Sequence, residues 1–122
     1  MPGVSIHVVD VTRGVVAAGM KVELFALAPT RRALVTGEIS ASGLLVTPLL
    51  EARFAQADYE AVFHVSDWYR AQGVTLPQTP FLSDVVYRFG IDDPQQHYHL
   101  PFKCTPWGYS CFRGGKQEQT TS

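Results

Sequence analysis

The sequence predicts an all-β fold, built as a two-sheet antiparallel β-sandwich with one short helix. Three observations lead to this prediction. Apolar and polar residues alternate along five segments, clusters of Gly, Pro and Asp separate those segments, and 46% of the 122 residues are hydrophobic. Alternation with a period of two gives a strand one apolar face. Two sheets bury such faces by packing against each other, so a sandwich is the natural architecture.

Each alternating segment has the length and the residue types of a β-strand. In the first segment, residues 4–9, apolar side chains stand at the even positions, whereas Ser5 and His7 face the other side. The same alternation recurs in four further segments, which are residues 20–26, 59–65, 84–91 and 97–104. Weaker strands are expected over residues 32–36, 44–47 and 109–113.

One short helix is expected between the third and fourth of the main strands. Ser66 or Asp67 can accept hydrogen bonds from the free amides of a first helical turn. Gly73 can end the helix in a left-handed conformation, which costs glycine less than other residues.

The chain length corresponds to one domain with one hydrophobic core. We expect the sandwich to occupy residues 1–115. The remaining residues, 116–122, are polar and have no apolar anchor, so we expect them to form a flexible tail.

Charge and composition argue against several classes of protein. The 10 Lys and Arg residues and the 11 Asp and Glu residues give a formal net charge of −1, which offers no basic surface to a phosphate backbone. No apolar run has the length that spans a bilayer, and the N-terminus lacks the basic and apolar regions of a secretory signal. We therefore expect a cytoplasmic protein that binds neither nucleic acid nor membrane.

The two cysteines, Cys104 and Cys111, flank a turn-like segment across which they could face each other. In a reducing compartment free thiols are the expected state. A zinc site of the usual kind needs more thiols or a closer pair, so the cysteines do not predict one. We expect neither a metal nor a cofactor.

The residues suited to chemistry lie on the strand faces opposite the core. By parity, this set comprises His7, His97, His99 and Lys103. A neutral imidazole is the natural general base for activating water near pH 7. If two strands bring His7 and His99 to one cleft, the two rings could divide the roles of base and electrophile. Parity alone leaves two alternatives open: solvated histidines, or half of a metal site at His97 and His99.

Several motifs are spread over residues 4 to 115. They are Ser5-Ile6-His7-Val8-Val9-Asp10, Ala17-Ala18-Gly19-Met20-Lys21-Val22, Asp67-Trp68-Tyr69 with Gly73, His97-Tyr98-His99-Leu100-Pro101, Pro106-Trp107-Gly108-Tyr109-Ser110 and Phe112-Arg113-Gly114. In these motifs the chain resembles the transthyretin-like family, whose enzymes are 5-hydroxyisourate hydrolases. The resemblance implies a transthyretin-like (prealbumin-like) sandwich of two four-stranded sheets. It also implies a homotetramer, a dimer of dimers, with active sites in the channel where the dimers meet.

The resemblance implies an activity as well. Family members open the ring of 5-hydroxyisourate, an unstable product of urate oxidation, by adding water to a ring carbonyl, and they need no metal. We therefore expect a hydrolase that opens a cyclic amide or imide ring of a small heterocyclic substrate in purine catabolism. Two alternatives remain: an enzyme that acts on another heterocycle in a different pathway, and a non-catalytic protein that binds a small ligand in the same channel.

Carried over residue by residue, the resemblance gives a divergent member of the family. His7 and His99 match the family's catalytic histidines, and Arg113 and Gly114 match part of its C-terminal Tyr-Arg-Gly-Ser. The family's Asp-Gly-Arg falls on Ser42-Gly43-Leu44, and Phe112 stands in place of the tyrosine. The loss of an arginine matters because fixed positive charge stabilises a developing oxyanion.

The predicted site follows from these matches. We assign catalytic roles to His7, His99 and Arg113, and substrate contacts to Lys103, Ser110, Phe112, Gly114 and Leu44. Lys103 stands where the family usually has leucine, and parity places it on the same face as His99. We hypothesise that Lys103 projects into the channel and replaces the lost cation; the alternative is a lysine that only extends into solvent from a strand end.

Overall fold

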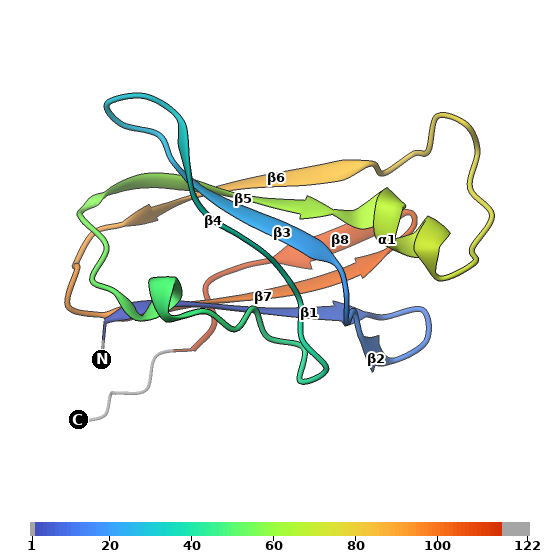
Figure 1. The fold of residues 1–122 in the computed structure, drawn as a ribbon, viewed down its shortest axis with the longest axis horizontal. Helices are drawn as coiled ribbons and strands as arrows, with labels where there is room; N and C mark the ends of the chain where they lie inside the picture. Colours follow the sequence, from blue (N-terminus) through green and yellow to red (C-terminus); the bar gives the residue numbers. More distant parts are fainter. Residues whose placement is uncertain (1, 116–122) are drawn as a thin grey trace.

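The computed structural model describes residues 2–115, which form two packed four-stranded sheets (Figure 1). One sheet has the order β2-β1-β7-β8, and its strands are β1 (Gly3–Asp10), β2 (Val15–Val16), β7 (His97–Thr105) and β8 (Gly108–Cys111). The other has the order β4-β3-β5-β6, with β3 (Lys21–Ala26), β4 (Arg32–Glu38), β5 (Ala57–His64) and β6 (Asp84–Ile91). The predicted all-β sandwich is confirmed, and the predicted tail, 116–122, lies outside the described residues.

The core lies between the sheets and is formed by the alternating apolar side chains. In β1 and β7 the residues at even positions are buried, whereas the odd positions from Ser5 onward in β1, and throughout β7, are turned to the outer face of the sheet. The rings of Phe63 on β5 and Phe102 on β7 stack across the core with centroids 3.8 Å apart, and both are fully buried. Stacked aromatic rings of this size contribute a large share of the buried apolar surface that holds two sheets together.

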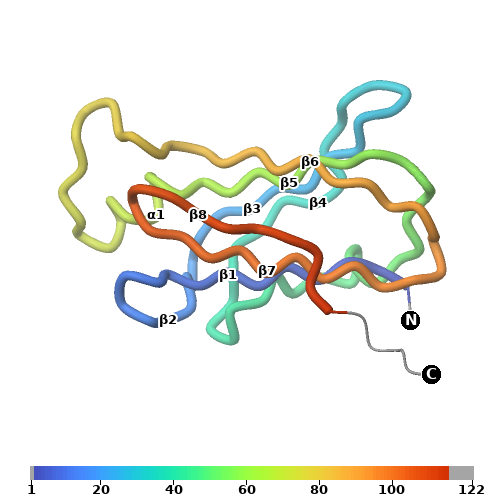
Figure 2. Tube along the Cα trace, turned by 180° about the vertical axis from the view of Figure 1, so that it is seen from behind, coloured from blue at the N-terminus to red at the C-terminus, as the bar shows by residue number. Residues whose placement is uncertain are grey.

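The direction of one strand pair differs from the antiparallel pattern that the alternation suggested. β1 and β7 run parallel over their whole length, whereas the other pairings of named strands are antiparallel. Figure 2 shows β7 turning back into β8, so that the described chain ends close to the start of β1. Alternation reports which face a side chain takes and carries no information about strand direction.

The weaker strand predictions have mixed outcomes. Residues 32–36 are confirmed as part of β4, and residues 109–113 are confirmed only as far as Cys111. The strand predicted over residues 44–47 is wrong, because this segment makes only isolated bridges, His7 with Leu44 and Ile39 with Leu45. It is followed at once by a 3₁₀-helix, η1 (Pro48–Glu51), whose first turn is capped by the Thr47 side chain. Pro48 has no N–H to continue a ladder, which favours the helical turn.

The predicted helix is confirmed as α1 (Val65–Ala71), but its predicted cap is wrong. The residue before the helix is His64, which makes no capping hydrogen bond with its side chain, and Ser66 and Asp67 lie inside the first turn. β5 runs directly into α1, so no loop residue is left to act as a cap. Gly73 has a φ of +85° after the helix, as predicted. Among the described residues, no helix has the length and apolar character needed to cross a membrane.

A buried carboxylate connects β1 to α1. Asp10 is fully buried, and its Oδ1 accepts hydrogen bonds from the Tyr69 hydroxyl (2.6 Å) and from both the backbone amide (3.0 Å) and the hydroxyl of Thr12. Its Oδ2 accepts a hydrogen bond from Arg13 Nε (3.0 Å). Burial raises the pKa of Asp10, but the hydrogen bonds from Thr12, Tyr69 and Arg13 outweigh it, so the net pKa is lowered and the carboxylate stays charged.

The Tyr69 hydroxyl should therefore contribute to folding. Tyr69→Phe removes one donor from a buried charge and should reduce the free energy of unfolding by about 1–3 kcal/mol, measured by urea denaturation. Arg13→Ala is the matched control, because the Arg13 side chain is 47% exposed and its ion pair should contribute less than about 1 kcal/mol. Equal losses in the two variants would contradict this account of Asp10.

Candidate active site

The outer face of the sheet β2-β1-β7-β8 gathers histidines from two strands. The parallel register of β1 with β7 places Ser5 beside His99 and His7 beside Pro101. His7 and His99 are each partly buried. The structure thus brings together the two histidines that the sequence analysis selected, on one face and at neighbouring positions of adjacent strands.

His99 is held on more than one side. Its Nδ1 lies 2.6 Å from the hydroxyl of Ser5, and its backbone carbonyl accepts a hydrogen bond from the amide of Gly114 (2.7 Å). A Cβ on Gly114 would come within 2.6 Å of the His99 ring, so only glycine allows this close approach. Burial lowers the pKa of His99, and the nearby His7 and His97 lower it further. His99 therefore remains a neutral base at lower pH than an ordinary histidine.

His7 is held by the turn that precedes Leu44. The carbonyl of Gly43 accepts a hydrogen bond from the amide of Val8 (2.9 Å), and Leu44 forms a bridge with His7. Gly43 has a φ of +87°, and a Cβ there would lie 2.5 Å from Nε2 of His7. The side chain of His7 therefore packs directly against the backbone of Gly43.

Arg113 lies beside this site and anchors the segment that follows β8. Its Nη2 donates hydrogen bonds to the side chain of Gln96 (3.0 Å) and to the carbonyl of His97 (3.2 Å), and its guanidinium stacks 3.9 Å from the ring centroid of Tyr98. These contacts hold the chain where the next residue, Gly114, meets His99.

The remaining predicted residues form a second group further along the face. Lys103 pairs with Ser110 across β7 and β8, and Lys103 Nζ lies 5.8 Å from the ring centroid of Phe112. Lys103 is exposed and follows His99 by four residues, a separation of about 13 Å along the strand. Within the described part of one chain, the structure therefore places Lys103 on the predicted face, without a hydrogen bond to the histidines.

Ser5 and Gly43 are the contact residues that the sequence analysis did not assign to the site. Ser5 stands two positions before His7 on the same strand face, so parity was the available signal. Gly43 was recognised only as part of the motif that replaces Asp-Gly-Arg. Its close approach to His7 depends on tertiary packing and leaves no local pattern.

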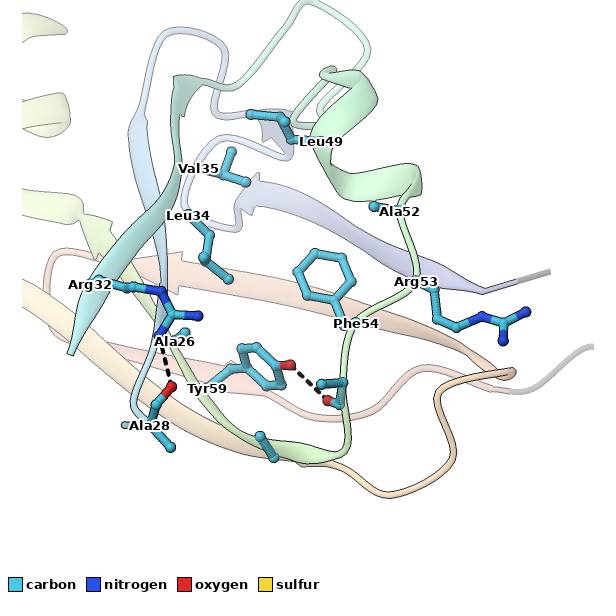
Figure 3. Close-up of a pocket in the computed structure, with 12 residues that line it drawn as sticks. Ala26, Ala28, Arg32, Leu34, Val35, Leu49, Ala52, Arg53, Phe54 and Tyr59 are labelled. Carbon is cyan, nitrogen blue, oxygen red and sulfur yellow. Dashed lines mark hydrogen bonds between the residues drawn. The ribbon is translucent and has the colours of Figure 1, made fainter. Parts of the chain in front are cut away.

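Two other features of the described chain are not suited to the same chemistry. A cavity of about 340 Å³ lies between β4 and the segment after η1 (Figure 3). The Tyr59 hydroxyl donates a hydrogen bond to the carbonyl of Ala55, and Arg32 donates one to the carbonyl of Ala28; each bond is 2.7 Å long. Both polar groups are therefore already paired. Arg53 points away from the cavity. The cavity therefore offers apolar surface and no free base.

The other feature is a cluster of possible metal ligands, His64, Asp67 and Asp84, near the start of α1. Both ring nitrogens of His64 are already in hydrogen-bond contact, Nε2 with Glu23 (2.7 Å) and Nδ1 with Asp84 (3.1 Å). This histidine thus has a structural role between β3, β5 and β6.

Gly43→Ala should displace His7. The variant adds a Cβ 2.5 Å from Nε2 of His7, at a positive φ, whereas Gly14→Ala meets the same kind of backbone strain (φ +69°) with no atom within 4 Å. Gly43→Ala should therefore cost about 1–3 kcal/mol more than Gly14→Ala in the free energy of unfolding. It should also shift the His7 ring signals in NMR spectra, and unchanged signals would contradict the packing of His7 against Gly43.

Comparisons with known proteins agree on one family. The HIUase/Transthyretin family model matches residues 4–114. A protein of Rhizobium meliloti (strain 1021) named 5-hydroxyisourate hydrolase 2 is 44% identical over 110 residues, which cover 88% of this chain and 92% of the relative.

Solved structures show the same likeness. The Klebsiella pneumoniae 5-hydroxyisourate hydrolase has a TM-score of 0.79 at 25% identity, covering 94% of this chain and 100% of that chain. The crystal structure of an (S)-allantoin synthase has a TM-score of 0.84 at 30% identity, covering 93% of this chain but 43% of that longer chain.

Proposed function

Because the chain belongs to the HIUase/Transthyretin family, we propose that it is a hydrolase that opens the ring of 5-hydroxyisourate in purine catabolism. The observation that carries this proposal is the pair of histidines on the outer face of β1 and β7. His99 has a lowered pKa and is held in place by Ser5 and Gly114, as a general base requires.

The reaction needs one water and no redox step. We propose that Nε2 of His99 takes a proton from water while the water oxygen bonds to a ring carbonyl carbon, so that the carbonyl oxygen becomes an oxyanion. When the oxyanion collapses, the bond from this carbon to the ring nitrogen breaks, and the nitrogen receives the proton from His99. His7, held against Gly43, orients the water or polarises the carbonyl.

The oxyanion needs positive charge, and we propose Arg113 for this role. Its hydrogen bonds to the described residues use Nη2, so within that part of the chain the Nε and Nη1 donors have no partner, and we propose that they bind the substrate. We propose that Lys103, Ser110, Phe112, Gly114 and Leu44 contact the heterocycle, with Lys103 supplying a second cation toward the far end of the face.

The test is the decay of freshly generated 5-hydroxyisourate, followed by ultraviolet absorbance after removal of urate oxidase. The protein should accelerate decay well above the spontaneous rate, and His99→Ala should lower kcat by about 10²–10⁴-fold, because general-base catalysis contributes that much. His64→Ala is the matched control, since His64 lies on the opposite sheet and should leave kcat unchanged. No acceleration would exclude this substrate and favour another heterocycle or a binding role.

We further propose that the chain assembles as a homotetramer, a dimer of dimers. Support comes from apolar side chains exposed at the site face, Leu44 at 37% and Phe112 at 46%. Sedimentation velocity should give the mass of four chains. Phe112→Glu should shift the population to smaller species, whereas Leu49→Glu, which charges an exposed position on η1, should not. A monomer for the unchanged protein would contradict the proposal.

We also propose a cytoplasmic location. Support comes from the two free cysteines, of which Cys104 is buried in the core and Cys111 is partly buried. Thiols of this kind persist in reducing compartments.

A further inference from the structure

A chain of hydrogen bonds connects the proposed base to the backbone near the N-terminus. Ser5 Oγ lies 2.6 Å from Nδ1 of His99 and 2.8 Å from Nε2 of His97. On its other side, Nδ1 of His97 lies 3.3 Å from the carbonyl oxygen of Pro2. The Ser5 hydroxyl thus lies between two imidazole rings, and the Pro2 carbonyl is the last group in this series of hydrogen bonds.

The carbonyl of Pro2 determines which group donates and which accepts in each of these hydrogen bonds. A carbonyl can only accept, so Nδ1 of His97 must carry the proton that it donates to Pro2. In neutral His97, Nε2 then has a lone pair and must accept from the Ser5 hydroxyl. Ser5 has only one proton to donate, so Nδ1 of His99 must be the donor to Ser5.

We propose that Ser5 and His97 are positioning residues that hold His99 in the tautomer with a proton on Nδ1 and a free lone pair on Nε2. Only this tautomer can take a proton from water through Nε2. The inference rests on the proposed hydrolysis, in which Nε2 of His99 is the base. It adds the reason why His99 takes the active tautomer, since an imidazole without such partners favours the proton on Nε2.

The tautomer can be measured without any substrate. In ¹⁵N NMR spectra of the full chain at about pH 8, where histidines are neutral, His99 should show a protonated Nδ1 and an unprotonated Nε2. In Ser5→Ala, which removes the acceptor, the proton should move mainly to Nε2. Ser5→Thr retains the hydroxyl and should restore the wild-type pattern. A wild-type His99 protonated on Nε2, or a tautomer that Ser5→Ala does not change, would overturn the proposal.

Kinetics give a second readout, provided that the protein hydrolyses 5-hydroxyisourate. Ser5→Ala should lower kcat by about 10- to 100-fold with little change in KM, as for other partners that orient a functional histidine. Ser5→Thr should recover most of the loss. His97→Phe removes the acceptor for the Ser5 hydroxyl and should therefore lower kcat by a similar factor to Ser5→Ala. An unchanged kcat in His97→Phe would exclude His97 as a positioning residue.

The two readouts separate this proposal from the proposed function. If the NMR pattern is as expected but 5-hydroxyisourate is not hydrolysed, the hydrogen-bond chain stands and the substrate assignment fails. If hydrolysis depends on His99 but Ser5→Ala does not change the tautomer of His99, the proposed function stands and the positioning role of Ser5 fails.

Discussion

The parallel pairing of β1 with β7 is the constraint on which both the fold and the site depend. This pairing joins the first strand of the chain to the seventh and places both in the middle of their sheet. Its register sets Ser5 against His99, which brings the two within hydrogen-bond distance. If one strand shifted by a single residue against the other, its outer side chains would turn into the core and its apolar side chains would turn outward. Burial of the apolar faces of both strands therefore fixes the register that brings Ser5 and His99 together.

Much of this arrangement could be predicted from the sequence because strand parity is a local property. The alternation in residues 4–9 and 97–104 predicted which side chains leave the core, and the structure places His7, His99 and Lys103 on that outer side. What parity could not predict is which strands are neighbours and in which direction they run. The resemblance to a known family supplied the overall architecture, and the register came only from the structure.

The parts that were missed depend on contacts between distant segments. Ser5 is an unremarkable serine on a strand until His97 and His99 are placed beside it, 92 and 94 residues later. Residues 44–47 contain enough β-branched and apolar residues to suggest a strand, but Pro48 and the cap from Thr47 turn the chain into η1 instead. Tertiary contacts therefore outweigh the strand propensity of this segment: Leu44 follows the turn that packs on His7, and η1 begins at Pro48.

That turn also explains how His7 keeps its place although the family resemblance implies an arginine where this chain has Leu44. What holds His7 is the backbone: the carbonyl of Gly43 binds the amide of Val8, and the missing Cβ leaves room for the imidazole. The side chain of Leu44 takes no part in those contacts, so it can change while His7 keeps its place. In the proposed hydrolysis, a cation for the oxyanion must then come from elsewhere, and Arg113 is fixed beside His97 by its stacking on Tyr98. The proposed mechanism thus separates the positioning of the base from the supply of charge and assigns them to different segments of the chain.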